Sequence, residues 1–244
     1  MVELGGQTAV ITGATGGIGK SVALALARRG VRLHLLVRDT AKGTQLAAEL
    51  AGIAPTVRFD VHEMDLSKDI RPAVELLLKG VPSVDILVHG AGALSLSTFA
   101  DLDERDFDFQ FQVNARAPLL LTKLLLPHLR KRPGQIVFLN SSVTQQNTKA
   151  HLIGYAASKY ALKSIADGIR NAVNDDGIRV LSVYPGRTAT PMQERVFRFE
   201  ARAYRGDRLL QPNDVAETIV GALVLPRTAE LTDLFVRPLR RSAE

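Results

Sequence analysis

The 244-residue sequence contains no cysteine. This absence excludes disulfides, thiolate-bound metals and a cysteine nucleophile. Long hydrophobic runs are also missing: the richest apolar segment, residues 119–126, is interrupted by Lys123 and falls well short of the roughly 20 residues that cross a bilayer. We therefore expect a soluble protein without a membrane partner.

Charge is not concentrated in any one part of the chain. Lys and Arg total 31 against 25 Asp and Glu, which gives a net charge of +6 and favours anionic ligands. The chain has neither a basic tail nor an alternation of basic and aromatic residues, so nothing in it supports a nucleic-acid partner. Residues 1–6 lack the basic and apolar stretches of a secretory signal, and we expect a cytoplasmic protein.

Strand-like apolar runs alternate with helical patterns from one end of the chain to the other. The strand-like runs are residues 8–12, 32–37, 56–61, 84–88, 135–140, 179–184 and 231–236. Because strands separated by helices cannot form hairpins, right-handed crossovers produce a mostly parallel sheet with helices on both faces. No linker or repeat divides the sequence. We predict a single α/β domain over residues 1–244, with a doubly wound parallel sheet of about seven strands.

The apolar pattern of individual runs indicates their place in the sheet. In the third run, Val57, Phe59 and Val61 alternate with polar residues, which is typical of an edge strand. Residues 9–11 and 86–88 are uniformly apolar, which places the first and fourth runs near the centre. In such sheets ligands bind beyond the carboxyl ends of the strands, where the strand order reverses.

A glycine-rich turn, Thr-Gly-Ala-Thr-Gly-Gly-Ile-Gly at residues 12–19, joins the first strand to a helical pattern at residues 20–29. Glycine adopts backbone angles closed to other residues and lets a phosphate approach the free N–H groups at the start of a helix. The alternative is a turn that binds nothing. The position of this turn, directly after the first strand, favours phosphate binding.

Tyr155 and Lys159 lie four residues apart at the start of an apolar-periodic helix, so both side chains share one face. A free tyrosine keeps its proton up to about pH 10, and a nearby cation stabilises the phenolate so that proton transfer becomes feasible nearer neutral pH. A packed tyrosine beside a surface lysine is the alternative, because this spacing is common by chance.

Gly13, Gly17 and Gly19, spaced Gly-x-x-x-Gly-x-Gly, together with Tyr-Ala-Ala-Ser-Lys at residues 155–159, resemble the short-chain dehydrogenase/reductase family over practically the whole chain. The resemblance implies a Rossmann-type fold and hydride transfer between a nicotinamide dinucleotide and a carbonyl or alcohol. It implies no metal. It also implies a catalytic set in which Tyr155 is the general acid/base: Asn114, Ser142, Tyr155 and Lys159.

Two members of this set rest on their spacing within the family. Ser142 stands thirteen residues before Tyr155, as does the family's serine that hydrogen-bonds the substrate oxygen, which leaves a structural role for Ser141. Ordinary turn chemistry for both serines is the alternative. Asn114 matches the position where an irregular helix lets a water link to the lysine, and Pro118 makes such a distortion reasonable. An asparagine buried for structure is the alternative.

The resemblance also implies which residues bind the dinucleotide. Asp65 and Leu66 match the pair that contacts adenine, although Asp65 could equally cap the next helix. Thr188 and Thr190 match the loop that binds the nicotinamide carboxamide. The full set of expected cofactor-binding residues is Gly13, Thr15, Gly17, Ile18, Gly19, Arg38, Asp65, Leu66, Gly90, Ala91, Tyr155, Lys159, Pro185, Gly186, Thr188 and Thr190.

The end of the second strand bears on the choice of cofactor. An acidic residue there would bind the adenosine 2′-hydroxyl and repel a 2′-phosphate, but this chain has Val37 and Arg38. Because a guanidinium binds phosphate through two hydrogen bonds, we expect NADP(H) to be preferred over NAD(H). Arg38 could instead be an ordinary solvated arginine. The nearby Asp39, and Gly16 where NADP-preferring relatives often have a basic residue, weaken the preference.

The chain departs from the family after the fourth strand, where His89-Gly90-Ala91-Gly92 replaces the usual Asn-Asn-Ala-Gly. We interpret His89 as a packed or sheet-bracing residue rather than a general base, since Tyr155 fills that role. The departure leaves a second function open, that of a non-catalytic NADP-binding sensor or scaffold on the same fold.

Residues 191–210 match the segment that covers the substrate in this family. Four arginines recur there at helical spacing and would form one positive stripe: Arg195, Arg198, Arg202 and Arg205. The stripe could attract an anionic substrate or close over the cofactor phosphates, and a solvated or subunit-facing surface is the alternative. Residues 227–238 resemble the region that contributes to subunit contacts, so we expect a homodimer or homotetramer.

Overall fold

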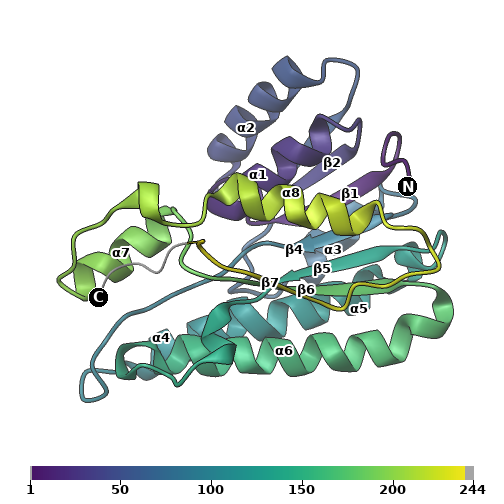
Figure 1. The fold of residues 1–244 in the computed structure, drawn as a ribbon. Coiled ribbons are helices and arrows are strands. Elements are labelled where there is room, and N and C mark those ends of the chain that lie inside the picture. Colours follow the sequence, from purple (N-terminus) through teal and green to yellow (C-terminus); the bar gives the residue numbers. More distant parts are fainter. Residues whose placement is uncertain (1, 240–244) are drawn as a thin grey trace.

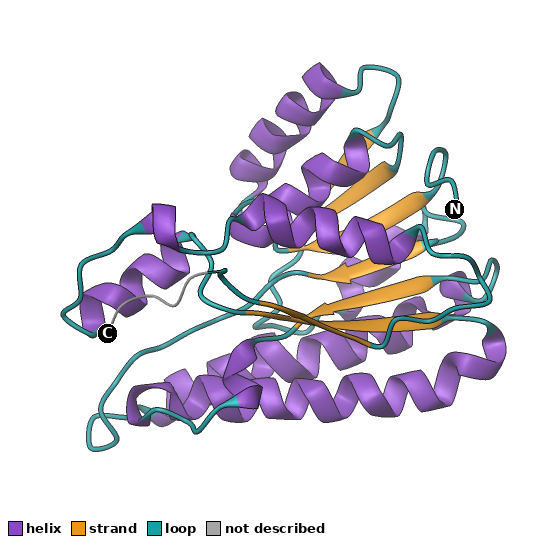
Figure 2. Ribbon diagram, viewed as in Figure 1, coloured by secondary structure: helices purple, strands orange, loops and turns teal. Residues whose placement is uncertain are grey.

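Seven parallel strands in one sheet form the centre of the protein. A computed structural model describes residues 2–239. The strands follow the order β3-β2-β1-β4-β5-β6-β7, and every neighbouring pair is parallel (Figure 2). They are β1 (Thr8–Thr12), β2 (Arg32–Val37), β3 (Phe59–Glu63), β4 (Ile86–His89), β5 (Gln135–Leu139), β6 (Arg179–Pro185) and β7 (Asp233–Val236). The predicted doubly wound, Rossmann-type fold is confirmed.

Helices cover both faces of the sheet (Figure 1). They are α1 (Gly17–Ala27), α2 (Thr40–Ile53), α3 (Arg71–Leu78), α4 (Glu104–Phe111), α5 (Ala117–Leu129), α6 (Ile153–Val173), α7 (Pro191–Phe199) and α8 (Pro212–Leu223). One core joins α1, α2 and α8 to the sheet, and a second core joins α3, α5 and α6 to its other face. α4 packs beside α6, and α7 stands apart from the sheet, beyond the carboxyl ends of the strands.

The uniformly apolar strands are those that contribute to both cores. In β1, Ala9 and Ile11 face the core under α1, whereas Val10 belongs to the core on the opposite face. β1 pairs with both β2 and β4 near the centre of the sheet, and β3 is the edge strand, as the alternation predicts. β3 begins later than expected, because residues 54–57 form a turn in which the Val57 N–H donates to the Ala54 carbonyl at 3.0 Å.

The strand order reverses between β1 and β4, and the chain segments that leave these two strands are tied together. The Thr12 hydroxyl oxygen accepts hydrogen bonds from the backbone N–H of Gly90 at 3.1 Å and of Ala91 at 3.3 Å. A Cβ at Gly90 would lie 2.6 Å from the Thr12 carbonyl oxygen, and a Cβ at Gly13 would lie 2.5 Å from the Ala91 nitrogen. Glycine is required at both positions because two backbones meet there.

Candidate active site

The predicted irregularity before Pro118 is present as a π-helical turn, η1 (Gln112–Arg116), between α4 and α5. Asn114 lies at its centre and is completely buried. Its Oδ1 accepts from the Ala93 N–H at 2.7 Å, and its Nδ2 donates to the Ala93 carbonyl at 2.8 Å and to the Ser158 Oγ at 2.9 Å. The side chain therefore fastens the loop after β4 to helix α6.

Ser158 is a residue of the site that the sequence analysis did not identify. Its hydroxyl accepts from Asn114 and donates to the Tyr155 carbonyl oxygen at 2.8 Å, and the residue is fully buried. A small polar residue one position before Lys159, in a helix whose buried face is otherwise largely apolar, was the available signal. These hydrogen bonds fix the first turns of α6, and with them both residues of the Tyr155–Lys159 pair.

The ammonium group of Lys159, on α6, is buried at the carboxyl end of β5. The side chain is almost inaccessible to solvent, and its Nζ donates to the Leu139 carbonyl at 2.8 Å. Nζ also lies 5.8 Å from the centroid of the Tyr155 ring. Burial lowers the pKa of Lys159 to about 8, because removing the ammonium from water disfavours its charged form. The predicted pair thus shares one site.

Ser141 and Ser142 lie shortly after the end of β5, and the side chain of Ser141 affects the pKa of Tyr155. Burial raises the pKa of Tyr155 above its ordinary value of 10.0, and a side-chain hydrogen bond with Ser141 works in the opposite direction. Ser141 has extended backbone and caps the 3-10 turn η2 (Ser142–Gln145), with its Oγ accepting from the Val143 N–H at 3.2 Å.

The two serines differ in the conformation of the backbone that carries them. β5 ends at Leu139, and the chain remains extended through Ser141 before it turns. Ser142 is the first residue of the turn. A second 3-10 turn, η3 (Ala150–Leu152), completes the connection to α6. The role expected for Ser142, a hydrogen bond to the substrate oxygen, stays a prediction.

The glycine-rich turn leaves open space at the start of α1. Within the described residues, no side chain caps α1, and a Cβ at its N-cap residue Gly16 would meet nothing within 4 Å. Gly17 has a φ of 51° and faces the Thr190 methyl group, so the turn after β1 meets the loop after β6. Uncapped N–H groups at a helix N-terminus fit the pyrophosphate of a dinucleotide.

The carboxylate of Asp39 is used to cap α2. Its Oδ1 accepts from the Lys42 N–H at 3.1 Å, and Lys42 Nζ lies 3.4 Å from Oδ2. The adjacent Arg38 is exposed at the end of β2. The acidic residue that weakened the NADP prediction is thus engaged with its own helix.

Asp65 forms a local turn and does not cap the next helix, α3, which begins at Arg71. Its Oδ1 accepts from the backbone N–H of Ser67 at 3.0 Å and from the Ser67 hydroxyl at 2.7 Å. Partial burial opposes ionisation, but these bonds and the charges of Lys68 and Arg38 hold the pKa of Asp65 below its ordinary value. Leu66 packs against the neighbouring core. The carboxylate therefore lies within the field of Arg38.

The loop after β6 forms its own hydrogen bonds. The Thr188 hydroxyl donates to the Gly186 carbonyl at 2.9 Å. Thr190 caps α7, with its Oγ1 accepting from the Gln193 N–H at 3.3 Å. Both threonines lie where the sequence placed them, at the carboxyl end of β6, and Thr190 combines this position with a capping role that the sequence analysis did not foresee.

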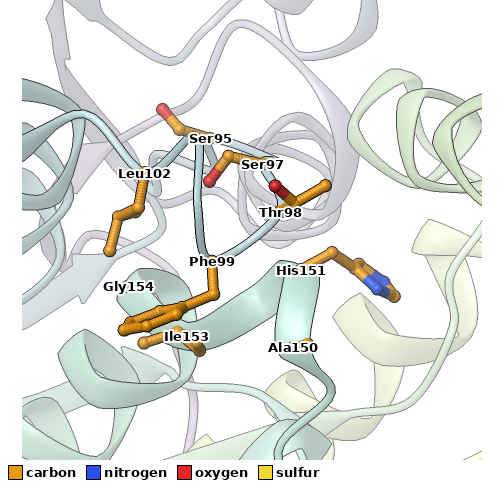
Figure 3. Close-up of a pocket in the computed structure, with 9 residues that line it drawn as sticks. All are labelled: Ser95, Ser97, Thr98, Phe99, Leu102, Ala150, His151, Ile153 and Gly154. Atoms are coloured by element: carbon orange, nitrogen blue, oxygen red, sulfur yellow. The ribbon is translucent and has the colours of Figure 1, made fainter.

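A shallow hollow lies between the loop after β4 and the start of α6 (Figure 3). The sequence analysis did not identify its lining, which combines hydroxyl groups with apolar side chains: Ser95, Ser97, Thr98, Phe99, Leu102, Ala150, His151, Ile153 and Gly154. Gly154 directly precedes Tyr155, so the hollow borders the turn of α6 that carries the tyrosine.

The four arginines of residues 191–210 do not form one stripe. α7 ends at Phe199, and the chain then turns through Ala201, whose φ is 51°. Three of the arginines have nearby carboxylates as partners: Arg198 with Glu194 at 3.6 Å, Arg202 with Glu200 at 3.5 Å and Arg205 with Asp207 at 3.2 Å. The arginines keep a helical spacing in the sequence beyond Phe199, although α7 itself ends there.

The part of the chain that the structure describes has no helix with the length and apolar character of a membrane span. The same residues contain no group of three or more His, Asp or Glu side chains placed to hold a metal ion.

The sequence profile of the short-chain dehydrogenases matches residues 7–201. The chain belongs to this family of oxidoreductases. It is 33% identical to the oxidoreductase UcpA of Salmonella typhimurium, over 94% of this chain and 85% of that protein. It is 30% identical to an uncharacterized oxidoreductase of Staphylococcus saprophyticus, over 98% of this chain and 100% of that protein.

Two solved structures of short-chain dehydrogenases or related enzymes share the fold. One is a short chain dehydrogenase from Escherichia coli complexed with NADPH, with a TM-score of 0.86, 27% identity, and coverage of 96% of this chain and 97% of that chain. The other is an alcohol dehydrogenase from the archaeon Thermococcus sibiricus complexed with 5-hydroxy-NADP, with a TM-score of 0.85, 26% identity, and coverage of 98% and 99%.

His89, where this short-chain dehydrogenase departs from its family's pattern, is a packed residue. Its Nε2 lies 2.8 Å from the Thr122 hydroxyl oxygen, and its ring stacks on Phe138 with centroids 4.7 Å apart. Burial lowers the pKa of His89 from 6.5 to about 3, so the imidazole is neutral in the folded protein at neutral pH.

This burial predicts a loss of stability in mild acid. As the pH falls below 6.5, an unfolded His89 takes up a proton whereas the folded one stays neutral down to about pH 3. The unfolded state is then favoured, by up to about 1.4 kcal/mol per pH unit for one such group. Urea unfolding of wild type and His89→Asn between pH 7 and pH 5 should show a shallower decline for the variant. Equal slopes would contradict a neutral, buried His89.

Proposed function

We propose that the protein interconverts a carbonyl and an alcohol with NADP(H), and that Tyr155 is its general acid/base. The observation that carries this proposal is the buried ammonium of Lys159, which lies 5.8 Å from the centroid of the Tyr155 ring. Ser142, at the start of the turn after β5, supplies the second hydroxyl. A proton donor, a second hydroxyl and a fixed cation are the groups that carbonyl reduction requires around the substrate oxygen.

Burial favours the protonated form of Tyr155, which is the form that acts in reduction. The bound nicotinamide cofactor supplies the hydride. Tyr155 donates its proton to the carbonyl oxygen, and the Ser142 hydroxyl donates a hydrogen bond to the same oxygen. The charge of Lys159 then stabilises the phenolate that remains. Alcohol oxidation uses the same groups in the reverse order.

Asn114 acts through its neighbours in this proposal. Its side chain is fully engaged with Ala93 and Ser158, so it holds the loop after β4 against α6 and fixes the position of Lys159. The π-helical turn around Asn114 breaks the regular helical hydrogen-bond pattern, which supports the expected water link to the lysine.

NADP(H) is the proposed cofactor because the cation at the end of β2 is free to bind phosphate whereas the adjacent carboxylate is not. Arg38 is exposed, and Asp39 is committed to capping α2. The structural relative from Escherichia coli was solved with NADPH and that from Thermococcus sibiricus with 5-hydroxy-NADP, which supports the same preference.

A homodimer or homotetramer is also proposed. The outer sides of α5 and α6 expose large apolar side chains, with Leu119 at 43% and Tyr160 at 45% exposure. Ala161 and Ile165 line a depression on the same surface. Covering this surface with a second copy would remove apolar area from water.

The proposed activity is tested by following NADPH oxidation with benzaldehyde, cyclohexanone and phenanthrenequinone. Turnover of at least one carbonyl is expected, with kcat/KM for NADPH at least about tenfold above that for NADH, because the Arg38 guanidinium binds the 2′-phosphate. Arg38→Ser should lose most of this preference while it retains NADH turnover. Equal use of both cofactors by wild type would contradict the assignment of NADP(H).

The two neighbouring serines provide a matched pair of variants. Ser142→Ala should lower kcat by about 10²-fold, since it removes a hydrogen bond to the oxygen on which charge develops. Ser141→Ala should change kcat by much less, because its hydroxyl caps the turn after β5. The measurement is steady-state kinetics on the carbonyl that wild type reduces best. A large loss with Ser141→Ala and none with Ser142→Ala would contradict the assignment of Ser142.

A further inference from the structure

Helix α7, which would cover the substrate, has few apolar contacts to hold it in place. Only two of its nine residues, Val196 and Phe197, are buried. In Figure 1 the helix stands away from the sheet, beyond the strand ends. Two buried side chains offset little of the conformational entropy that is lost when the segment is ordered, so a further set of contacts is needed to fix the helix.

Glu200, the residue directly after α7, supplies those contacts. Its side chain is only 8% exposed, and both carboxylate oxygens lie 2.8 Å from Nη2 of Arg187 in the loop after β6. Three further nitrogens lie near the carboxylate oxygens: Lys149 Nζ at 3.1 Å, His151 Nε2 at 3.4 Å and Arg202 Nη1 at 3.5 Å. We call these five residues the Glu200 cluster.

The cluster is reinforced by aromatic contacts. The Phe197 ring lies 4.8 Å from the guanidinium carbon of Arg187 and 5.3 Å from that of Arg202. Tyr204 meets the same ring edge-on at 5.6 Å. Ala201 is the only residue other than glycine with positive φ among the described residues, and this left-handed turn lets the Arg202 N–H return to the Phe197 carbonyl at 2.9 Å. Such a conformation is retained where surrounding contacts determine it.

His151 connects the Glu200 cluster to the hollow between the loop after β4 and α6, where we place the substrate; we call it the substrate hollow. It lines that hollow, yet its ring points away from Phe99 and Leu102 (Figure 3). On the other side, its Nε2 faces Glu200, and its ring lies 5.4 Å from the Phe199 ring at the end of α7. One carboxylate therefore joins three segments: the approach to α6, the loop after β6 and the end of α7.

We propose that Glu200 is a positioning residue that holds α7 as a preformed cover over the substrate hollow. The proposal rests on the function proposed above for the site that α7 covers. Glu200 touches neither Tyr155 nor Lys159. Its charge therefore affects substrate affinity through the placement of α7 and His151, and it does not take part in the chemical step. This assigns a purpose to a buried carboxylate that the sequence analysis did not single out.

The test compares Glu200→Gln with Glu194→Gln. Glu194 lies on the same helix and pairs with Arg198, but its side chain is 52% exposed. Glu200→Gln should accelerate hydrogen exchange of the α7 amides about tenfold and raise the KM for the most reactive of the three panel carbonyls about tenfold, with kcat within about threefold of wild type. Glu194→Gln should change none of these quantities.

The outcomes separate positioning from a purely structural role. A role in global stability alone would lower the fraction of active enzyme, and hence the apparent kcat, without changing KM. Unchanged α7 exchange in Glu200→Gln, or faster exchange with an unchanged KM, would overturn the proposal. The hydrogen-exchange measurement needs no substrate. It therefore tests the placement of α7 even if the protein reduces none of the carbonyls, which would be a failure of the proposed function.

A second variant keeps the proposal falsifiable where Glu200→Gln does not fold. Lys149 is 49% exposed, and Lys149→Met leaves the buried Glu200–Arg187 pair intact. It should raise the same KM about threefold and accelerate α7 exchange to a similar extent. If neither quantity changes in a folded Lys149→Met protein, the cluster does not position the cover.

Discussion

A buried ammonium group whose hydrogen-bond partner is a backbone carbonyl is the constraint on which this site depends. Removing a charge from water is costly, and Lys159 responds with a pKa of about 8. Near neutral pH it still carries its proton, held by the Leu139 carbonyl at the end of β5. The fold therefore maintains a positive charge next to a tyrosine whose own burial favours the neutral phenol. Each group has the protonation state that the proposed carbonyl reduction requires.

Several parts of the chain keep that cation in position. The π-helical turn brings Asn114 into the interior, where it bonds to the loop after β4 and to Ser158 on α6. The extended end of β5 carries Ser141, whose side chain affects the pKa of the tyrosine. On the cofactor side, the uncapped start of α1 lies beside the loop after β6. The segments proposed to carry the chemistry and to bind the cofactor thus meet at the carboxyl ends of the parallel strands.

The fold was predictable because strand and helix patterns alternate along the chain and because apolar periodicity distinguishes central from edge strands. The Tyr155–Lys159 pair was predictable because a helix fixes the relative position of residues four apart. The arginine stripe was wrong because spacing in the sequence does not show where a helix ends, and α7 ends at Phe199. Glu200 and Ser158 act through contacts between distant segments, which spacing does not reveal.

The most direct test of the central claim is hydride transfer by wild type and Tyr155→Phe from NADPH that carries deuterium at its transferable position. Wild type should transfer deuterium to the carbonyl carbon of the substrate. Tyr155→Phe should lower kcat by about 10²–10⁴-fold, because the proton donor is lost, while NADPH affinity measured by fluorescence stays within about threefold. Retention of wild-type turnover by Tyr155→Phe would contradict the account.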